Sequence, residues 1–200
     1  MKVFFFFLLF TCGINAQQLE SLKILKIKHD SIETQLKLKY QEEIKGKSES
    51  EISEIYYQNL LSRSKNNRER LDHYFSAVQT FLETQKLIGP SQEAAQQEIP
   101  DKTANYSQGF PALYKEVHDF IKNRYQDRLD EYFTKSAKIH FIVQNDHSLY
   151  IEKVEGTEKE FNDLALLAFL MTTGKWESAF QRGTNVKSKF VLPVKFVVEE

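Results

Sequence analysis

Histidine side chains are the residues of this sequence that could most readily bind a metal ion. There are five, and only two of them, His140 and His147, lie close enough together in sequence to flank one turn. A zinc site needs three or four ligands at defined spacings. We therefore interpret the histidines as surface or turn residues and expect no metal site. The five are His29, His73, His118, His140 and His147.

The second possible chemistry is acid catalysis by paired carboxyl groups. Asp127, Asp130 and Glu131 lie close together in sequence and could act in this way on a cell-wall polymer. They fall in a polar segment, where carboxylates are normally solvated. Trp176 could stack on a sugar, although a lone tryptophan more often anchors a core. The sequence has neither a glycine-rich phosphate loop nor a nucleophile elbow around a serine. We expect no enzyme, no cofactor and no small-molecule substrate.

The charge balance bears on the class of partner. Lys and Arg number 27 and Asp and Glu number 28, so the formal net charge is -1. A nucleic-acid binder normally has a strongly basic face. We therefore expect no nucleic-acid partner. With 200 residues, of which 41% are hydrophobic, the chain can form one or two small domains with real cores.

Residues 1–16 are typical of a secretory signal peptide. Lys2 is followed by an apolar run, Val3–Phe10, and Ala16 is a small residue that favours cleavage before Gln17. The apolar run is shorter than the roughly 20 residues that cross a bilayer. An uncleaved anchor and a lipoprotein signal using Cys12 are the alternatives. A mature chain beginning at Gln17 would have no cysteine, so we expect a disulfide-free protein of the Gram-negative periplasm.

Residues 17–89 are predicted to form a helical arm. Apolar residues recur there at three- and four-residue steps. Gly46 breaks the pattern, Ser50 is a candidate cap for a second helix, and Gly89 with Pro90 ends it. We expect an antiparallel helical hairpin or a coiled-coil arm. The apolar positions of the first helix are Leu19, Leu22, Leu25, Ile32 and Leu36.

Residues 90–105 contain almost no large apolar side chain and are predicted to be a linker. Residues 106–200 then form a second domain. Pro111 suits the first turn of a helix, Ala137–Val143 alternates as a strand does, and a returning strand begins at Leu149. Thr157–Glu160 has the pattern of a capping box that opens a helix running to Met171. That helix is apolar on nearly every side, so we expect it to be covered on both sides.

The last strand is predicted to have one buried face and to lie at a sheet edge. Pro193 has no amide proton to donate to a ladder, which favours an edge position. Trp176 and Gly183 frame a loop that leads into the strand, and we expect the indole to anchor that loop. The residues of the predicted buried face are Val186, Ser188, Phe190, Leu192, Val194, Phe196 and Val198.

The order helix, strand, strand, helix, strand predicts an α+β fold, a small antiparallel sheet backed by two helices and preceded by the helical arm. An exposed edge of such a sheet can take up an extended peptide as an added strand. We therefore predict a peptide-binding edge strand. Its residues are Val186, Ser188, Phe190, Leu192, Pro193, Val194 and Phe196.

The spacing of Trp176, Ala179, Gly183, Val186 and the closing Leu192–Phe196 resembles the end of the TonB C-terminal domain. The resemblance covers roughly residues 109–198. The chain departs from the family pattern in four places, one of which is Asn185 before Val186. His147 stands where the family has a turn glycine, and Ser178 stands where a proline commonly follows the tryptophan. The segment Arg124–Tyr132 keeps a tyrosine but lacks the family's Tyr-Pro.

The resemblance implies a periplasmic protein that binds an extended segment of an envelope or outer-membrane protein. Energy transducers of this family also carry an inner-membrane helix and a long proline-rich spacer, and neither is evident here. Our first expectation is therefore a secreted, non-enzymatic module that captures its partner by strand addition. The alternatives are a TonB-like energy transducer acting on outer-membrane transporters, and a structural scaffold that forms a homodimer through the second domain.

Overall fold

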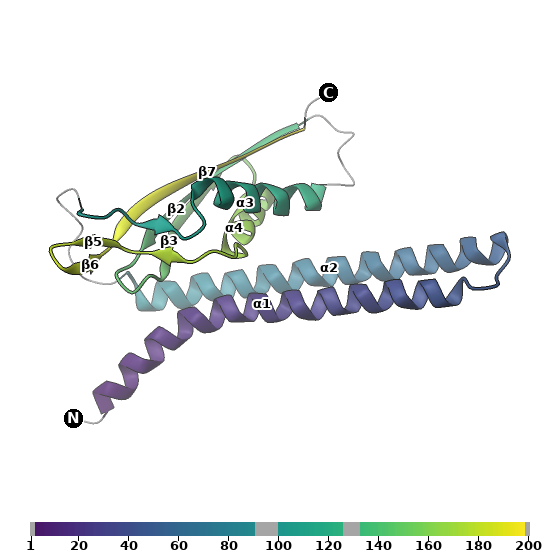
Figure 1. Cartoon of the computed structure of the whole chain (residues 1–200), viewed down its shortest axis with the longest axis horizontal. Coiled ribbons are helices and arrows are strands. Elements are labelled where there is room, and N and C mark those ends of the chain that lie inside the picture. Colours follow the sequence, from purple (N-terminus) through teal and green to yellow (C-terminus); the bar gives the residue numbers. More distant parts are fainter. Residues whose placement is uncertain (1–2, 91–99, 126–132, 199–200) are drawn as a thin grey trace. The chain divides into compact units, whose positions relative to one another are not determined.

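The computed structural model describes residues 3–90, 100–125 and 133–198 of the chain (Figure 1). Within these residues the fold is α+β, with four helices and small antiparallel sheets. The chain divides into two compact units, Met1–Phe81 and Leu82–Glu200. The acids Asp127, Asp130 and Glu131, and residues 91–99 of the predicted linker, lie outside the described residues.

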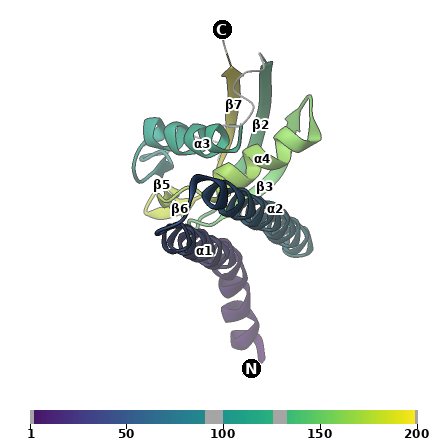
Figure 2. The same cartoon turned by 90° about the vertical axis from the view of Figure 1, so that its right-hand side faces the viewer.

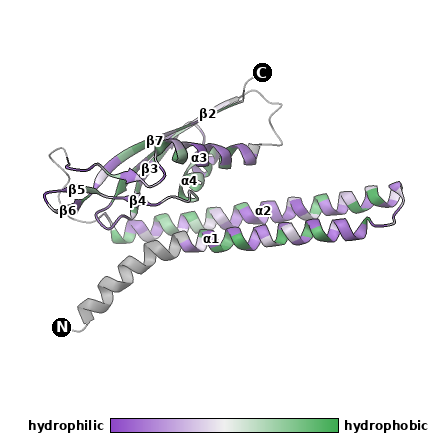
Figure 3. Ribbon diagram, viewed as in Figure 1, coloured by the Kyte–Doolittle hydropathy of each residue, from purple (hydrophilic) through white to green (hydrophobic). Residues whose placement is uncertain are grey.

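The first unit is an antiparallel helical hairpin of α1 (Val3–Glu43) and α2 (Glu49–Ile88), so the structure selects the hairpin from the two predicted forms of the arm (Figure 1). Arg63 pairs with Glu33 over 2.7 Å, and the two side chains join the helices. Hydrophobic residues recur between hydrophilic ones along α2 and along the coloured part of α1 (Figure 3). Helix α1 continues without a break past the predicted cleavage point after Ala16. None of the described helices is both long and apolar enough to span a bilayer.

Ser48, and not Ser50, begins the second helix of the hairpin. The backbone N–H of Ser48 donates to the Glu51 carboxylate over 3.0 Å, and the backbone N–H of Glu51 lies 3.5 Å from the Ser48 hydroxyl oxygen. This reciprocal pair is a capping box, which satisfies two backbone donors at a helix start. The prediction of Ser50 as the cap was wrong by two residues because both serines precede the apolar run.

The second unit contains a three-stranded antiparallel sheet of β2 (Phe133–Val143), β3 (Leu149–Gly156) and β7 (Ser188–Val198). The strand order is β3-β2-β7, so β7 lies at an edge of this sheet, as Pro193 predicts. The register aligns Phe141 with Phe190 and Ile139 with Leu192. These apolar side chains therefore lie on one face of the sheet.

Two helices, α3 (Phe110–Tyr125) and α4 (Lys159–Leu170), cover this apolar face, with α3 beside β7 and α4 beside β2 and β3 (Figure 2). Helix α4 also packs against α3, which explains why it is apolar nearly all round. Its first turn differs from the prediction, because Glu158 is the N-cap and its side chain makes no capping hydrogen bond. The buried residues of α4 are Phe161, Leu164, Ala165, Leu166, Leu167, Ala168, Phe169 and Leu170.

The predicted loop before the last strand contains two short strands, β5 (Ala179–Gln181) and β6 (Thr184–Val186), which pair as a hairpin. Arg182 and Gly183 form its turn with φ angles of 48° and 84°, and two successive positive φ values are typical of tight hairpin turns. Val186 therefore belongs to β6 and not to the final strand.

The start of the second unit also differs from the predicted boundary at residue 106. Strand β1 (Asn105–Tyr106) pairs with β4 (Trp176–Glu177), so the end of the predicted linker belongs to this unit. The unit also includes the last turns of α2, from Leu82 onward, which the sequence assigned to the arm.

Candidate peptide-binding edge

The side chains predicted to form the edge site mostly anchor β7 in the core. Leu192, Val194 and Phe196 are buried, and Ser188 and Phe190 are half-buried. A guest strand pairs with backbone groups at an edge, and side chains that face the core are not available to it. These residues therefore fix the position of β7, while the groups that a guest would contact lie elsewhere on the strand.

The opposite edge of the sheet is closed by Gln85, a residue of the last turn of α2 that is only 4% exposed. Its amide nitrogen Nε2 donates to the carbonyl of Leu149 over 2.5 Å, and its oxygen Oε1 accepts from the backbone N–H of Ile151 over 2.9 Å. The side-chain amide thus forms the two hydrogen bonds that a neighbouring strand would form. Strand β3 is consequently protected at this point from pairing with another chain.

The bonds of Gln85 also establish which backbone groups of β7 face outward. The N–H of Ile151 and the carbonyl of Leu149 bond to Gln85 and therefore point away from β2. In an antiparallel pair, the residues opposite them must also point their N–H and C=O groups away from the shared ladder. These residues, Phe141 and Val143 on β2, therefore direct their backbone groups toward β7. Phe141 is aligned with Phe190 in the unbroken register between β2 and β7. Even-numbered residues of β7 therefore bond to β2, and odd-numbered residues direct their N–H and C=O groups to the free edge.

Pro193 agrees independently with this assignment. Its nitrogen carries no proton, and prolines in sheets are tolerated where that nitrogen faces away from the ladder. No strand in the described ranges pairs with the outer side of β7. The sequence prediction named six even-numbered residues together with Pro193, and the proline was the signal that pointed to the odd-numbered side. The outward-facing residues are Lys189, Val191, Pro193, Lys195 and Val197.

The sheet face remote from α3 and α4 has an excess of positive charge near this edge. Lys189 is paired with Glu152 over 2.7 Å. On β3, a hydrogen bond from Lys153 lowers the pKa of Glu155, which also accepts from His140 Nε2 over 2.9 Å if that nitrogen carries the proton. The side chains of Glu152 and Glu155 are thus already paired with neighbouring basic side chains. By contrast, Lys138 and Lys195 are exposed, are diagonal neighbours in the register, and form no ion pair with any described residue.

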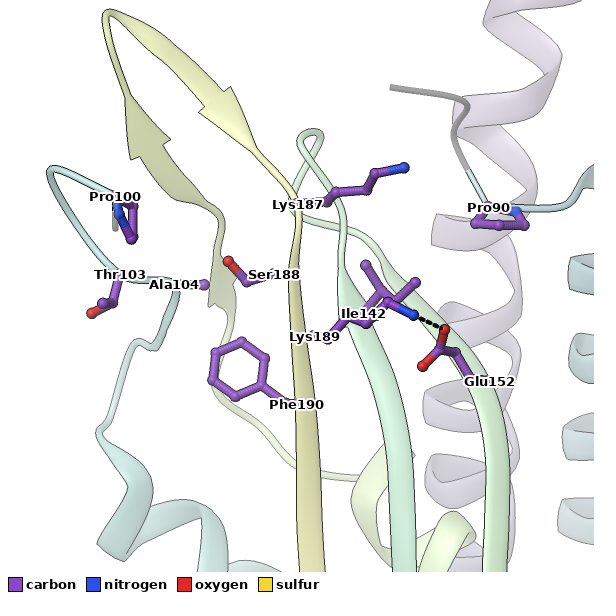
Figure 4. Close-up of a pocket in the computed structure, with 10 residues that line it drawn as sticks. All are labelled: Pro90, Pro100, Thr103, Ala104, Ile142, Glu152, Lys187, Ser188, Lys189 and Phe190. Atoms are coloured by element: carbon purple, nitrogen blue, oxygen red, sulfur yellow. Dashed lines mark hydrogen bonds and ion pairs between the residues drawn. The ribbon is translucent and has the colours of Figure 1, made fainter. Parts of the chain in front are cut away.

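A pocket of about 630 Å³ lies at the first residues of β7 (Figure 4). Phe190 and Ser188 lie on its side nearest Ala104, while Lys189 is directed toward Ile142 and Glu152. The pocket therefore reaches both faces of the strand at the start of the open edge. Its lining residues are Pro90, Pro100, Thr103, Ala104, Ile142, Glu152, Lys187, Ser188, Lys189 and Phe190.

Trp176 connects the start of β7 to the core. The indole is 7% exposed. Its ring centroid lies 5.1 Å from that of Phe141 on β2 and 5.6 Å from that of Phe190 on β7. It also lies 6.2 Å from the ring of Phe169 on α4. A buried indole in an aromatic cluster is well placed to hold β7 in position, but it is too enclosed to stack on a sugar. Gly183, by contrast, is exposed in the hairpin turn.

Within the described residues, most of the histidines lie apart from one another, and their nearest polar neighbours are not clusters of carboxylates. His29 and His73 do meet in the hairpin, where Nε2 of the first lies 3.1 Å from Nδ1 of the second. Within the described ranges, no three His, Cys, Asp or Glu side chains gather at one point. His147 accepts a hydrogen bond from the backbone N–H of Ser178, and His140 lies beside Glu155.

Comparisons of this chain with protein-family models, with curated proteins and with solved structures find no match. The geometry of the two sheet edges is therefore the basis on which a function can be inferred.

Proposed function

We propose that this chain is an exported, non-enzymatic binding module that captures an extended segment of an envelope protein as an added strand along β7. The observation that carries the proposal is the asymmetry of the sheet. Gln85 occupies two backbone groups at the start of β3, whereas the outward-facing backbone groups of β7 have no partner strand within the described residues. Main-chain hydrogen bonds to an edge provide affinity without a preformed cavity.

The open edge is long enough to hold a guest segment, because β7 has 11 residues. It also carries the devices by which natural proteins limit unwanted pairing, namely a proline in its middle and lysines along it. Pro193 interrupts the row of outward N–H groups, and Lys189 and Lys195 lie on either side of it. An edge that is restricted in this way, while the start of the other edge is occupied by Gln85, is consistent with selective pairing.

The proposed compartment is the periplasm, after removal of residues 1–16. Its support is the charged start, the short apolar run and the small residue at Ala16. The resemblance of the second unit to the TonB C-terminal domain supports the same compartment. Mass spectrometry of the protein recovered from a bacterial envelope fraction tests this proposal. A mature chain starting at Gln17 supports it, and an intact Met1 contradicts it.

Residue-resolved hydrogen exchange tests strand addition. The probe is a strand-length peptide of alternating threonine and valine, and its control is the same peptide with every amide N-methylated. We expect the first peptide to slow amide exchange at Val191 and Lys195, and the methylated peptide to leave it unchanged because it lacks the donors. No slowing with either peptide, at concentrations that saturate other strand-addition domains, contradicts the proposal.

A further inference from the structure

One flank of the open edge is aromatic. Phe110, Tyr114 and His118 are spaced four residues apart on α3 and so lie on one stripe of that helix. The ring of Phe110 lies 6.1 Å from that of Phe190, and the ring of His118 lies 5.5 Å from that of Phe196. Since both ends of the stripe contact β7, Tyr114 lies between them along the strand, and it is 43% exposed.

The other flank is basic and partly apolar. The side chains of Lys189, Val191, Pro193 and Lys195 lie on the sheet face remote from the helices, with Val191 53% exposed. Lys138 on β2 lies next to Lys195 in the register, and neither forms an ion pair with a described residue. An added strand would thus have aromatic rings beside one of its faces and the ammonium group of Lys195 beside the other, with Lys138 one strand further away.

We propose that the guest is a two-faced segment in which apolar side chains alternate with carboxylates, and this inference rests on the proposed function. Successive side chains of a strand point to opposite faces. The apolar residues of the guest would therefore lie beside Phe110 and Tyr114. The carboxylates would lie beside Lys195 on β7, since opposite charges on neighbouring strands stabilise pairing, and Lys138 lies one strand further from the guest, on β2.

The same charges disfavour a second copy of β7 as the occupant. In an edge-to-edge pair of two β7 strands, the outward-facing odd-numbered residues of one copy would oppose those of the other. Lys189 and Lys195 would then lie beside lysines, prolines or Val191 on the same face, and like charges directly opposite destabilise a sheet. No carboxylate lies on that face of the strand between residues 189 and 195. An acidic and apolar segment of another protein fits the edge better.

Three strand-length peptides test the inference with the full chain: alternating glutamate and valine, alternating lysine and valine, and alternating glutamate and serine. Binding is measured by calorimetry at low ionic strength, and the position by amide exchange at Val191. We expect the glutamate and valine peptide to bind tightest. The lysine and valine peptide should bind about fivefold more weakly, since the favourable pair with Lys195 becomes repulsive. The glutamate and serine peptide should also bind more weakly, because it lacks the apolar face.

Charge and side-chain variants of the protein sharpen the test. Lys195→Glu should weaken binding of the glutamate and valine peptide by about two- to fivefold and strengthen binding of its lysine counterpart. Lys45→Glu makes the same charge change in the turn of the hairpin and should change neither affinity. Tyr114→Ser should reduce affinity for both valine-containing peptides, whereas Tyr57→Ser, which removes an exposed tyrosine of α2, should not.

The outcomes separate the inference from the proposed function. If the glutamate and lysine peptides bind equally and both slow exchange at Val191, strand addition stands and the two-faced guest is overturned. If no peptide binds and exchange at Val191 is unchanged, the proposed function fails and this inference fails with it. The result that supports both proposals is a preference for the glutamate and valine peptide over the lysine and valine peptide. Lys195→Glu should reverse this preference, and Lys45→Glu should leave it unchanged.

Discussion

The backbone N–H of Ser178 donates a hydrogen bond to Nδ1 of His147 over 2.9 Å. The Ser178 hydroxyl oxygen also lies 2.7 Å from this nitrogen and 3.2 Å from the carbonyl of Asn145. In the resemblance to the TonB C-terminal domain that we propose, these two positions correspond to a turn glycine and a proline. Proline has no N–H, so the two departures are physically linked: a histidine acceptor requires a residue that can donate.

His147 also occupies the left-handed backbone region, with φ of 68°. His147→Gly loses the hydrogen bond, worth about 1 kcal/mol, but relieves a backbone cost of roughly 1 kcal/mol, so its free energy of unfolding should stay close to that of the parent. His147→Ala loses the bond and keeps the cost, and should be about 1 kcal/mol less stable than His147→Gly. Urea titrations of the two variants check this, and equal stabilities would contradict it.

Gln85 should be required for the integrity of the β3 edge. Gln85→Ala leaves the N–H of Ile151 and the carbonyl of Leu149 without their partner, which should cost about 1–3 kcal/mol in the free energy of unfolding and promote aggregation. Gln85→Glu can still accept but cannot donate to Leu149, so it should also destabilise the unit. The matched control is Lys86→Ala at the exposed neighbouring position. Urea titration measures the change in the free energy of unfolding, and light scattering measures aggregation. If neither Gln85 variant changed the stability, the side-chain amide would not be protecting the edge of β3.

Pro193 should limit the affinity of the open edge. Pro193→Ala restores one outward N–H, and one additional backbone hydrogen bond of about 1 kcal/mol corresponds to about fivefold tighter peptide binding. The same change should increase self-association at high protein concentration. Pro111→Ala, in the first turn of α3, serves as the control. Calorimetry with the glutamate and valine peptide checks the prediction, and weaker binding by Pro193→Ala would show that the proline nitrogen does not face the guest.

Glu51 should make the helical hairpin sensitive to acid. The backbone N–H and hydroxyl of Ser48 and the ammonium group of Lys47 hold the pKa of Glu51 at about 2, below its ordinary value of 4.5. A depressed pKa means that the contribution of Glu51 to stability is fully present above pH 4.5 and is lost as the pH falls through about 2. Thermal unfolding followed by circular dichroism should therefore show a smaller loss over this window for Glu51→Gln. Glu49→Gln should behave as the parent, and a parent-like loss in Glu51→Gln would contradict the assignment.

Periodicity and proline placement predicted much of the second unit. The alternation of Ala137–Val143 and the apolar helix ending near Met171 gave strands and helices where the structure has them. Pro193 predicted an edge strand because a missing N–H is a local property of one residue. The cap at Ser48 was also within reach, since Glu51 follows it by three residues.

Features that depend on long-range contacts were not predictable in the same way. Gln85 lies more than sixty residues before the strand that it protects, and nothing in its local sequence indicates this partner. The hairpin turn at Arg182 was missed because arginine is not a residue that signals a positive φ. The predicted edge site listed mostly residues that face the core, because burial pattern alone does not tell which backbone groups face outward. That required the register with β2 and the bonds of Gln85.

Residue-resolved amide exchange of the free protein by NMR tests the central claim most directly. If the outer side of β7 is open, exchange should alternate along the strand. The amides of Phe190, Leu192, Val194 and Phe196 should exchange slowly because they bond to β2, and those of Lys189, Val191 and Lys195 should exchange fast. Uniformly slow exchange across β7 would mean that the chain already covers this edge, and the account of an open edge awaiting a guest strand would be wrong.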